Sequence, residues 1–265
     1  MKCCILVGHG KGSSGGYDPG AVNGQYHEFR IAREIAKAAA ERLRSVYHAD
    51  SGLLNYDGTY NLPERIARFQ DHAFDFLAEI HLNAGDGTAS GTEVYYFPGD
   101  NAGQAYARNV SGAVSAALEI PNRGAKGSDY FGIIRETVPT AVLVETCFIG
   151  KDLDKVKTAA GQLAAGNAIA DGIAVAAGLQ SSAREGWVQA SSAWYWYEDG
   201  EPVKDVWRKS DGWWYRLGPD GKMLTGLVEV DGKGYYLNQS RATVGGVYVP
   251  QGACVVTDGS GAIVK

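Results

Sequence analysis

The chain has 265 residues, of which 45% are hydrophobic and 21% are charged. This length fits one large domain or two ordinary ones, and the composition excludes a disordered chain, a collagen and a disulfide-rich scaffold. The formal net charge of −5 argues against nucleic-acid binding, and without a run of about 18 apolar residues no membrane insertion is expected. The apolar run before Gly8 has only five residues, 3–7, too few for a signal peptide, so we expect synthesis in the cytoplasm without an export signal.

Strand and helix signals alternate through the first 178 residues. In chain order they predict a strand over 3–7, helices over 29–46 and 63–74, strands over 76–80 and 92–97, a helix over 102–118, a strand over 140–145 and a helix over 153–177. This alternation predicts an α/β fold, with a mostly parallel sheet covered by helices on both faces. In such sheets the functional site lies at the carboxyl ends of the strands.

The last third of the chain has a different pattern. All six tryptophans lie there, in short aromatic runs separated by Asp-Gly dipeptides at 199–200, 220–221 and 231–232. Asp-Gly between β-prone runs is a strong hairpin signal, and the runs recur about every 20 residues. The sequence therefore predicts a first domain over 1–178, a linker over 179–186 and a small all-β domain of stacked hairpins over 187–265.

Four residues of the first domain form a candidate site. His9 and His81 each follow a predicted strand, Glu145 ends one, and Glu28 lies at the start of the first predicted helix. If the strands are parallel neighbours, all four side chains lie at the same edge of the sheet. Two imidazoles and one carboxylate are a common ligand set for catalytic zinc, and a second carboxylate can then act as general acid/base.

Other interpretations of these residues stay open. A histidine after an apolar run is often a hydrogen-bonded core residue, and Glu28 suits a first helical turn because of the helix dipole. Glu79 and Glu93 are rival carboxylates; we expect Glu79 to pair with an arginine and Glu93 to face water. The remaining histidines are expected to be solvated and the cysteines to be free thiols: His27, His48, His72, Cys3, Cys4, Cys147 and Cys254.

Several segments of the first domain, in order, carry a family resemblance. They are Gly8-His9-Gly10, residues 18–24 leading to Glu28, Glu64-Arg65, and residues 80–84, 91–96 and 139–149. Together they resemble the zinc-dependent N-acetylmuramoyl-L-alanine amidases of the amidase_3 type, found in autolysins and phage endolysins. The resemblance implies a twisted six-stranded sheet, Zn²⁺ as cofactor, metal ligands His9, Glu28 and His81, and Glu145 as the catalytic acid/base. Cys147 stands where the family usually has glycine, and we expect it to fill buried space.

The tryptophan-rich region resembles the choline-binding or cell-wall-binding repeats of Gram-positive surface proteins and phage lysins. Residues 207–226 fit one repeat, and Trp207 and Trp214 are the candidate rings for stacking on a wall ligand. Leu227 stands where such repeats usually have tryptophan. We therefore expect a glycan ligand in place of choline.

Together these resemblances imply an endolysin-like peptidoglycan hydrolase. It would cleave the amide between N-acetylmuramic acid and L-alanine, with peptidoglycan and a cell-wall polymer as its partners, after release onto the cell wall during phage lysis. Two alternatives are a zinc peptidase acting on stem-peptide bonds and a non-catalytic wall-binding protein. The presence of all four expected groups argues against the second alternative.

Overall fold

The computed structural model has two compact units, Met1–Gln180 and Ser181–Lys265. This division falls within the predicted linker over 179–186. The structure describes residues 1–85, 87–180, 186–190, 193–198, 200–240, 242–244, 247–257 and 263–264. Most of the predicted linker and Asp199 of one predicted turn therefore lie outside the described residues.

The first unit is built on a six-stranded sheet in the order β6–β1–β7–β10–β8–β9. In that order the strands are Asp50–Leu54, Lys2–Val7, Phe76–Asn83, Thr140–Phe148, Thr92–Tyr96 and Asn122–Gly127. The first four run parallel, whereas β8 is antiparallel to β10 and parallel to β9. The predicted mostly parallel α/β fold is confirmed. The sequence did not predict β6 and β9, because these edge strands have only one neighbour each and carry few apolar residues.

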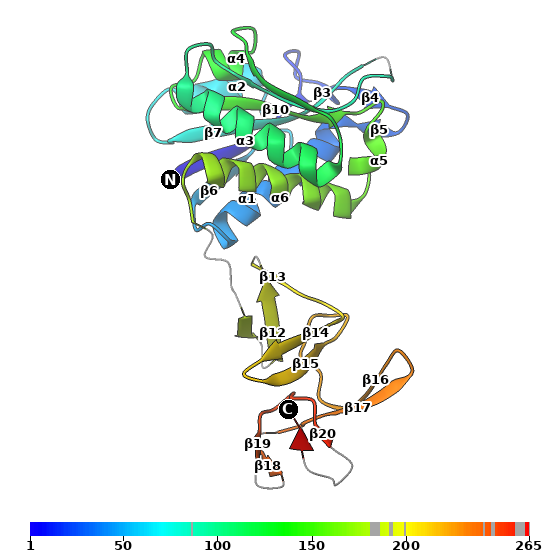
Figure 1. The fold of residues 1–265 in the computed structure, drawn as a ribbon. Helices are drawn as coiled ribbons and strands as arrows, with labels where there is room; N and C mark the ends of the chain where they lie inside the picture. The colour runs from blue at the N-terminus through cyan, green and yellow to red at the C-terminus, as the bar shows by residue number, and fades with distance from the viewer. Residues whose placement is uncertain are drawn as a thin grey trace. The chain divides into compact units, whose positions relative to one another are not determined.

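Helices cover both faces of the sheet, as predicted. On one face lie α1 (Glu28–Ser45), α3 (Asn101–Leu118) and α6 (Ala159–Ala176); on the other lie α2 (Leu62–Ile66), the 3₁₀ turn η1 (Ala67–Phe69) and α4 (Gly132–Arg135), as Figure 1 shows. The helix predicted over 63–74 is therefore shorter. The helix predicted over 153–177 is two helices, α5 (Leu153–Val156) and α6, because Thr158 caps α6 by accepting a hydrogen bond from the Gly161 N–H at 3.2 Å.

On the side of α2 and α4, apolar residues cover only part of the sheet face, and polar residues occupy the rest. Its apolar cluster includes Leu77 on β7 and Leu143 on β10. Because side chains on one face of a strand recur every two residues, the same face continues with Glu79 and His81 on β7 and with Glu145 on β10. The candidate site therefore lies where the apolar packing on this face ends.

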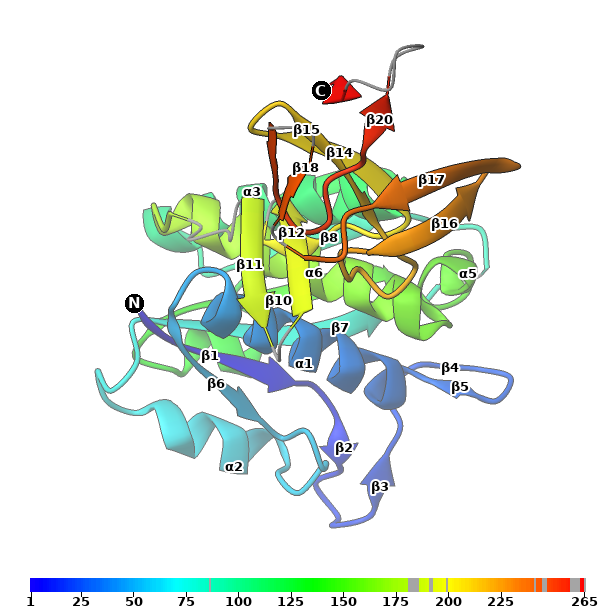
Figure 2. The same cartoon turned by 90° about the horizontal axis from the view of Figure 1, so that it is seen from below.

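Two small hairpins follow β1 at its carboxyl end: β2 (Gly10–Lys11) with β3 (Tyr17–Asp18), and β4 (Val22–Asn23) with β5 (Tyr26–His27), both visible in Figure 2. They carry the chain from His9 to Glu28, the first residue of α1. Among the described residues, no helix combines the length and hydropathy that a membrane crossing requires.

The second unit is a small all-β domain of hairpins, as predicted. Its strands are β11 (Gly186–Ala190), β12 (Ala193–Glu198), β13 (Glu201–Pro202), β14 (Val206–Ser210), β15 (Trp213–Leu217), β16 (Gly226–Val230), β17 (Lys233–Leu237), β18 (Ala242–Val244), β19 (Val247–Val249), β20 (Val256–Thr257) and β21 (Ile263–Val264). The turn between β16 and β17 has positive φ at both Asp231 (52°) and Gly232 (72°), as an Asp-Gly hairpin turn requires. Trp213 and Tyr215 are buried in a small core of this unit.

Candidate active site

Three of the predicted site residues meet at the carboxyl end of the parallel strands. His9 follows β1, Glu28 begins α1, and His81 lies on β7, and one potential ligand atom from each lies within 4.8 Å of the others. The Glu28 carboxylate oxygen Oε1 is 3.2 Å from His9 Nε2 and 2.8 Å from His81 Nδ1. One nitrogen of each imidazole therefore faces the same carboxylate oxygen.

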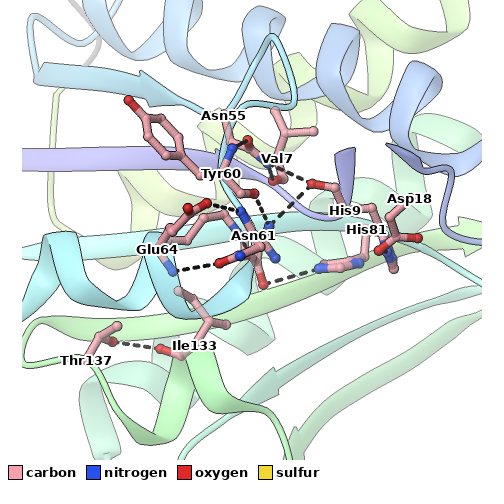
Figure 3. A network of polar contacts seen from close by, with 12 residues as sticks. Val7, His9, Asp18, Asn55, Tyr60, Asn61, Glu64, His81, Ile133 and Thr137 are labelled. Atoms are coloured by element: carbon pink, nitrogen blue, oxygen red, sulfur yellow. Dashed lines mark hydrogen bonds and ion pairs between the residues drawn. The ribbon is translucent and has the colours of Figure 1, made fainter. Parts of the chain in front are cut away.

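The backbone around His9 is held in an unusual conformation. His9 has a φ of 63°, in the left-handed region that non-glycine residues rarely adopt. Its carbonyl oxygen accepts hydrogen bonds from Asn55 Nδ2 at 2.8 Å and from Arg65 Nη1 at 3.3 Å, part of the network in Figure 3. On the ring, Nδ1 lies 2.9 Å from Asp18 Oδ2, which leaves Nε2 toward Glu28.

Glu28 is buried, and its carboxylate is well supplied with donors. Oε2 accepts a hydrogen bond from the Ala21 N–H at 2.7 Å, and Oε1 accepts one from the Leu82 N–H at 3.0 Å. Burial alone would raise the pKa of Glu28, but hydrogen bonds with His81 and His9 hold this pKa well below its usual range. Glu28 is therefore an ionised carboxylate at neutral pH.

A buried ion pair lies behind His81. The second ring nitrogen, Nε2, is 3.2 Å from Glu79 Oε2, and Glu79 Oε1 accepts a hydrogen bond from Arg65 Nε at 2.8 Å. The side chains of Arg65 and Glu79 are 5% and 2% exposed, so the pair is shielded from water. Arg65 thereby supports both histidines, one through Glu79 and the other through the His9 carbonyl. The expectation that Glu79 pairs with an arginine is confirmed.

The residues present fit a zinc ion by donor type and by the space around them. Two imidazoles and one carboxylate match the usual ligands of catalytic zinc. In such sites a carboxylate commonly holds the second ring nitrogen of each histidine, as Asp18 and Glu79 do here. Two glycines leave room for the side chains of His81 and Glu28. A Cβ on Gly8 would lie 2.1 Å from His81 Cε1, and a Cβ on Gly20 would lie 2.5 Å from Glu28 Oε2.

Glu145 lies next to this cluster but in different surroundings. On β10 it pairs in register with His81 of β7 and with Glu93 of β8. Its Oε2 is buried and has no hydrogen-bond partner among the described residues. Burial raises the pKa of Glu145 to about 7, which is the range in which a carboxyl group exchanges protons at neutral pH.

The expectation that Glu93 faces water is wrong. Glu93 is 3% exposed and forms ion pairs with Arg123 and Lys126 of β9. The sequence prediction failed because β9 was not foreseen. Sequence reasoning also missed Asp18 and the role of Glu79 beside His81; the separation of two residues along one strand, which places both side chains on the same face, was the available signal for Glu79.

In the second unit, the structure brings the two predicted binding rings together. Trp207 and Trp214 line a cavity of about 330 Å³ with Tyr235 and Cys254. The Trp207 and Tyr235 ring centroids are 4.9 Å apart, and Trp214 is 46% exposed.

Comparisons with known proteins identify the family of this chain. The profile of the Amidase_3 family, described as N-acetylmuramoyl-L-alanine amidase, matches residues 3–175. A sporulation-specific N-acetylmuramoyl-L-alanine amidase of Bacillus subtilis (strain 168) is 30% identical over 191 residues, covering 70% of this chain and 72% of that protein. N-acetylmuramoyl-L-alanine amidase CwlM of Bacillus licheniformis is 30% identical over 188 residues, covering 69% and 71%.

Solved structures share the fold. The catalytic domain of the CD27L endolysin targeting Clostridia Difficile is 29% identical, with a TM-score of 0.56, and the match covers 65% of this chain and 96% of that one. The catalytic domain of CwlV, an N-acetylmuramoyl-L-alanine amidase of Bacillus (Paenibacillus) polymyxa var. colistinus, has a TM-score of 0.60 at 24% identity and covers 68% and 100%. The chain therefore belongs to the Amidase_3 family of N-acetylmuramoyl-L-alanine amidases, and its activity is peptidoglycan hydrolysis.

Proposed function

We propose that the first unit is a zinc-dependent amidase that cleaves the bond between N-acetylmuramic acid and L-alanine. In this proposal His9, Glu28 and His81 hold the metal and Glu145 is the general acid/base. The observation that carries the proposal is the convergence of His9 Nε2 and His81 Nδ1 on one ionised carboxylate, beside a second carboxyl group whose pKa is about 7.

Each residue has a separate task in this mechanism. A bound zinc ion would supply Lewis acidity toward the scissile carbonyl and would lower the pKa of a water molecule toward about 7. Asp18 and Glu79 hold the ring nitrogens that face away from Glu28, and so fix the tautomer of each histidine. Glu145 accepts a proton from the attacking water and then donates it to the nitrogen of the leaving L-alanine, which departs as an amine.

Fragment analysis of digested cell walls tests this proposal. Purified sacculi are incubated with the full chain, with and without a zinc chelator, and the released fragments are identified by mass spectrometry. We expect peptides with a free L-alanine amino terminus and glycan strands with unsubstituted muramic acid, only when zinc is present. New amino termini within the stem peptide would support a zinc peptidase, and binding without release of fragments would support a non-catalytic wall protein.

We further propose that the second unit binds a cell-wall polymer, so that the whole chain acts as an endolysin-like enzyme. The cavity lined by Trp207, Trp214 and Tyr235 supports this, because aromatic rings stack on sugars. Leu227, which is 85% exposed, stands where choline-binding repeats usually have tryptophan, so a glycan is proposed as the ligand. Elution of the wall-bound protein by millimolar choline would contradict the glycan assignment.

A further inference from the structure

The sheet face that carries His81 and Glu145 continues to Glu93 and then to two cationic side chains. His81, Glu145 and Glu93 are register partners on the neighbouring strands β7, β10 and β8. Since adjacent strands lie about 4.8 Å apart, the backbone of Glu93 is about 10 Å from that of His81. Arg123 and Lys126 on β9 contact Glu93 from the far side.

The Glu93 carboxylate is saturated by donors. Its Oε1 accepts hydrogen bonds from Asn83 Nδ2 and Tyr95 Oη, each at 2.8 Å. Its Oε2 accepts from Arg123 Nε and Lys126 Nζ, each at 2.5 Å. Burial alone would raise the pKa of Glu93, but the bonds from Lys126 and Arg123 hold this pKa at about 2. The ionised Glu93 carboxylate balances one of its two cationic partners, so Glu93, Arg123 and Lys126 together carry one net positive charge.

The Arg123 side chain is positioned by packing contacts and by one hydrogen bond through its Nε. Its side chain lies over Gly91, where a Cβ would come 3.0 Å from Arg123 Cγ, and its guanidinium carbon lies 5.0 Å from the Phe148 ring centroid. Among the described residues, only its Nε has a hydrogen-bond partner, so both terminal nitrogens are open. The side chains of Arg123 and Lys126 are 38% and 35% exposed, so a ligand can reach them.

Two terminal nitrogens of one guanidinium group match the two oxygens of a carboxylate. On the glycan side of the scissile bond, the carboxyl group of muramic acid is already used in the amide. A free carboxylate near the reacting bond must therefore come from the peptide side. One residue of extended peptide spans about 3.5 Å, so the residue after L-alanine lies within reach of a site about two strand spacings from His81.

We propose that Arg123, assisted by Lys126, binds a carboxylate of the stem-peptide residue that follows L-alanine. The enzyme then prefers peptides in which this group is a free acid over peptides in which it is an amide. This assignment rests on the proposed amidase function, since it uses the position of the scissile bond beside Glu145.

Two soluble muropeptides that differ only in this group test the assignment. The ratio of kcat/KM for the acid substrate to that for the amide substrate is measured with the zinc-loaded full chain. We expect a ratio of about ten or more, because a hydrogen bond to a charged group contributes about 1.5–3 kcal/mol. Arg123→Gln should bring the ratio close to one, mainly by raising KM for the acid, and Arg123→Lys should give an intermediate ratio. Arg44→Gln, which removes a cation at the far end of α1, should keep the original ratio.

Each other outcome overturns a defined part of the assignment. Equal cleavage of both muropeptides by the unmodified chain would overturn the carboxylate site and leave the amidase function standing. An unchanged ratio in Arg123→Gln, with zinc content and thermal unfolding like those of the unmodified chain, would also overturn it. Failure of the unmodified chain to cleave either muropeptide would overturn the proposed function and this inference with it.

Discussion

Glu28 and Glu145 lie at the same edge of the sheet, yet their carboxylates have opposite surroundings. Glu28 has two backbone N–H donors and two imidazoles around it, and its pKa lies well below the usual range. Glu145 has a buried oxygen without a partner among the described residues, and its pKa is about 7. A metal ligand has to be ionised and fixed, whereas a proton carrier has to titrate near neutral pH. The two environments therefore suit two different tasks.

The largest expected effect comes from breaking the metal-binding side. His81→Ala or His9→Ala should remove stoichiometric zinc and abolish turnover, because the two remaining ligands cannot hold a catalytic zinc ion. Metal analysis of the purified variants measures this. His27→Ala is the matched control, since His27 precedes Glu28 but lies outside the ligand cluster, and it should keep its zinc. Full zinc occupancy in His81→Ala would contradict the ligand assignment.

A smaller effect is expected from the ion pair behind His81. Glu79→Gln should weaken zinc binding by about 10–100-fold, because it removes the carboxylate that orients the imidazole. Competition with a chromophoric chelator gives the affinity. Glu64→Gln is the control, since Glu64 is an exposed carboxylate on α2 whose side chain bonds to Lys11 and to the α2 cap. Equal zinc affinity in Glu79→Gln and Glu64→Gln would show that Glu79 has no positioning role.

Glu93 should make stability depend on pH without acting in catalysis. Its pKa is about 2 in the folded chain, against an ordinary value of 4.5, so its contribution to stability is fully present above pH 4.5 and is lost as the pH falls toward 2. At pH 7, Glu93→Gln should lower the free energy of unfolding by about 1–2 kcal/mol. This range is reduced because Arg123 and Lys126 are partly exposed, so water screens their attraction to Glu93. Denaturant unfolding at pH 7 and pH 3 should show the gap closing at the lower pH. Glu41→Gln, an exposed change on α1, should show no such trend, and a gap that stays constant would contradict the ion-pair account.

The smallest effect is expected in the second unit. Trp214→Ala should weaken binding to sacculi by about 2- to 13-fold, because stacking on one ring contributes about 0.5–1.5 kcal/mol. A sedimentation assay with purified sacculi measures this. Trp213→Ala is the contrast: Trp213 is buried, so its loss should unfold the unit and not merely weaken binding. Unchanged sedimentation of Trp214→Ala would remove this ring from the proposed binding surface.

The sequence was sufficient for most of the fold and for the main groups of the site. Apolar runs and helical spacings predicted β1, β7, β8, β10 and the three long helices, because buried residues are what produce those patterns. The edge strands β6 and β9 carry few apolar residues, so they were missed, and the partners of Glu93 were missed with β9. Asp18 could not be foreseen, since its contact with His9 depends on the β2–β3 hairpin and leaves no periodic signal.

The most direct test of the account compares the two carboxylates in one experiment. Zinc content and turnover are measured side by side for Glu28→Gln and Glu145→Gln. We expect Glu28→Gln to lose zinc and Glu145→Gln to keep it while losing about 10²–10⁴-fold in turnover, the usual contribution of a general acid/base. The opposite result, with zinc lost from Glu145→Gln and kept by Glu28→Gln, would contradict the assignment and exchange the two roles.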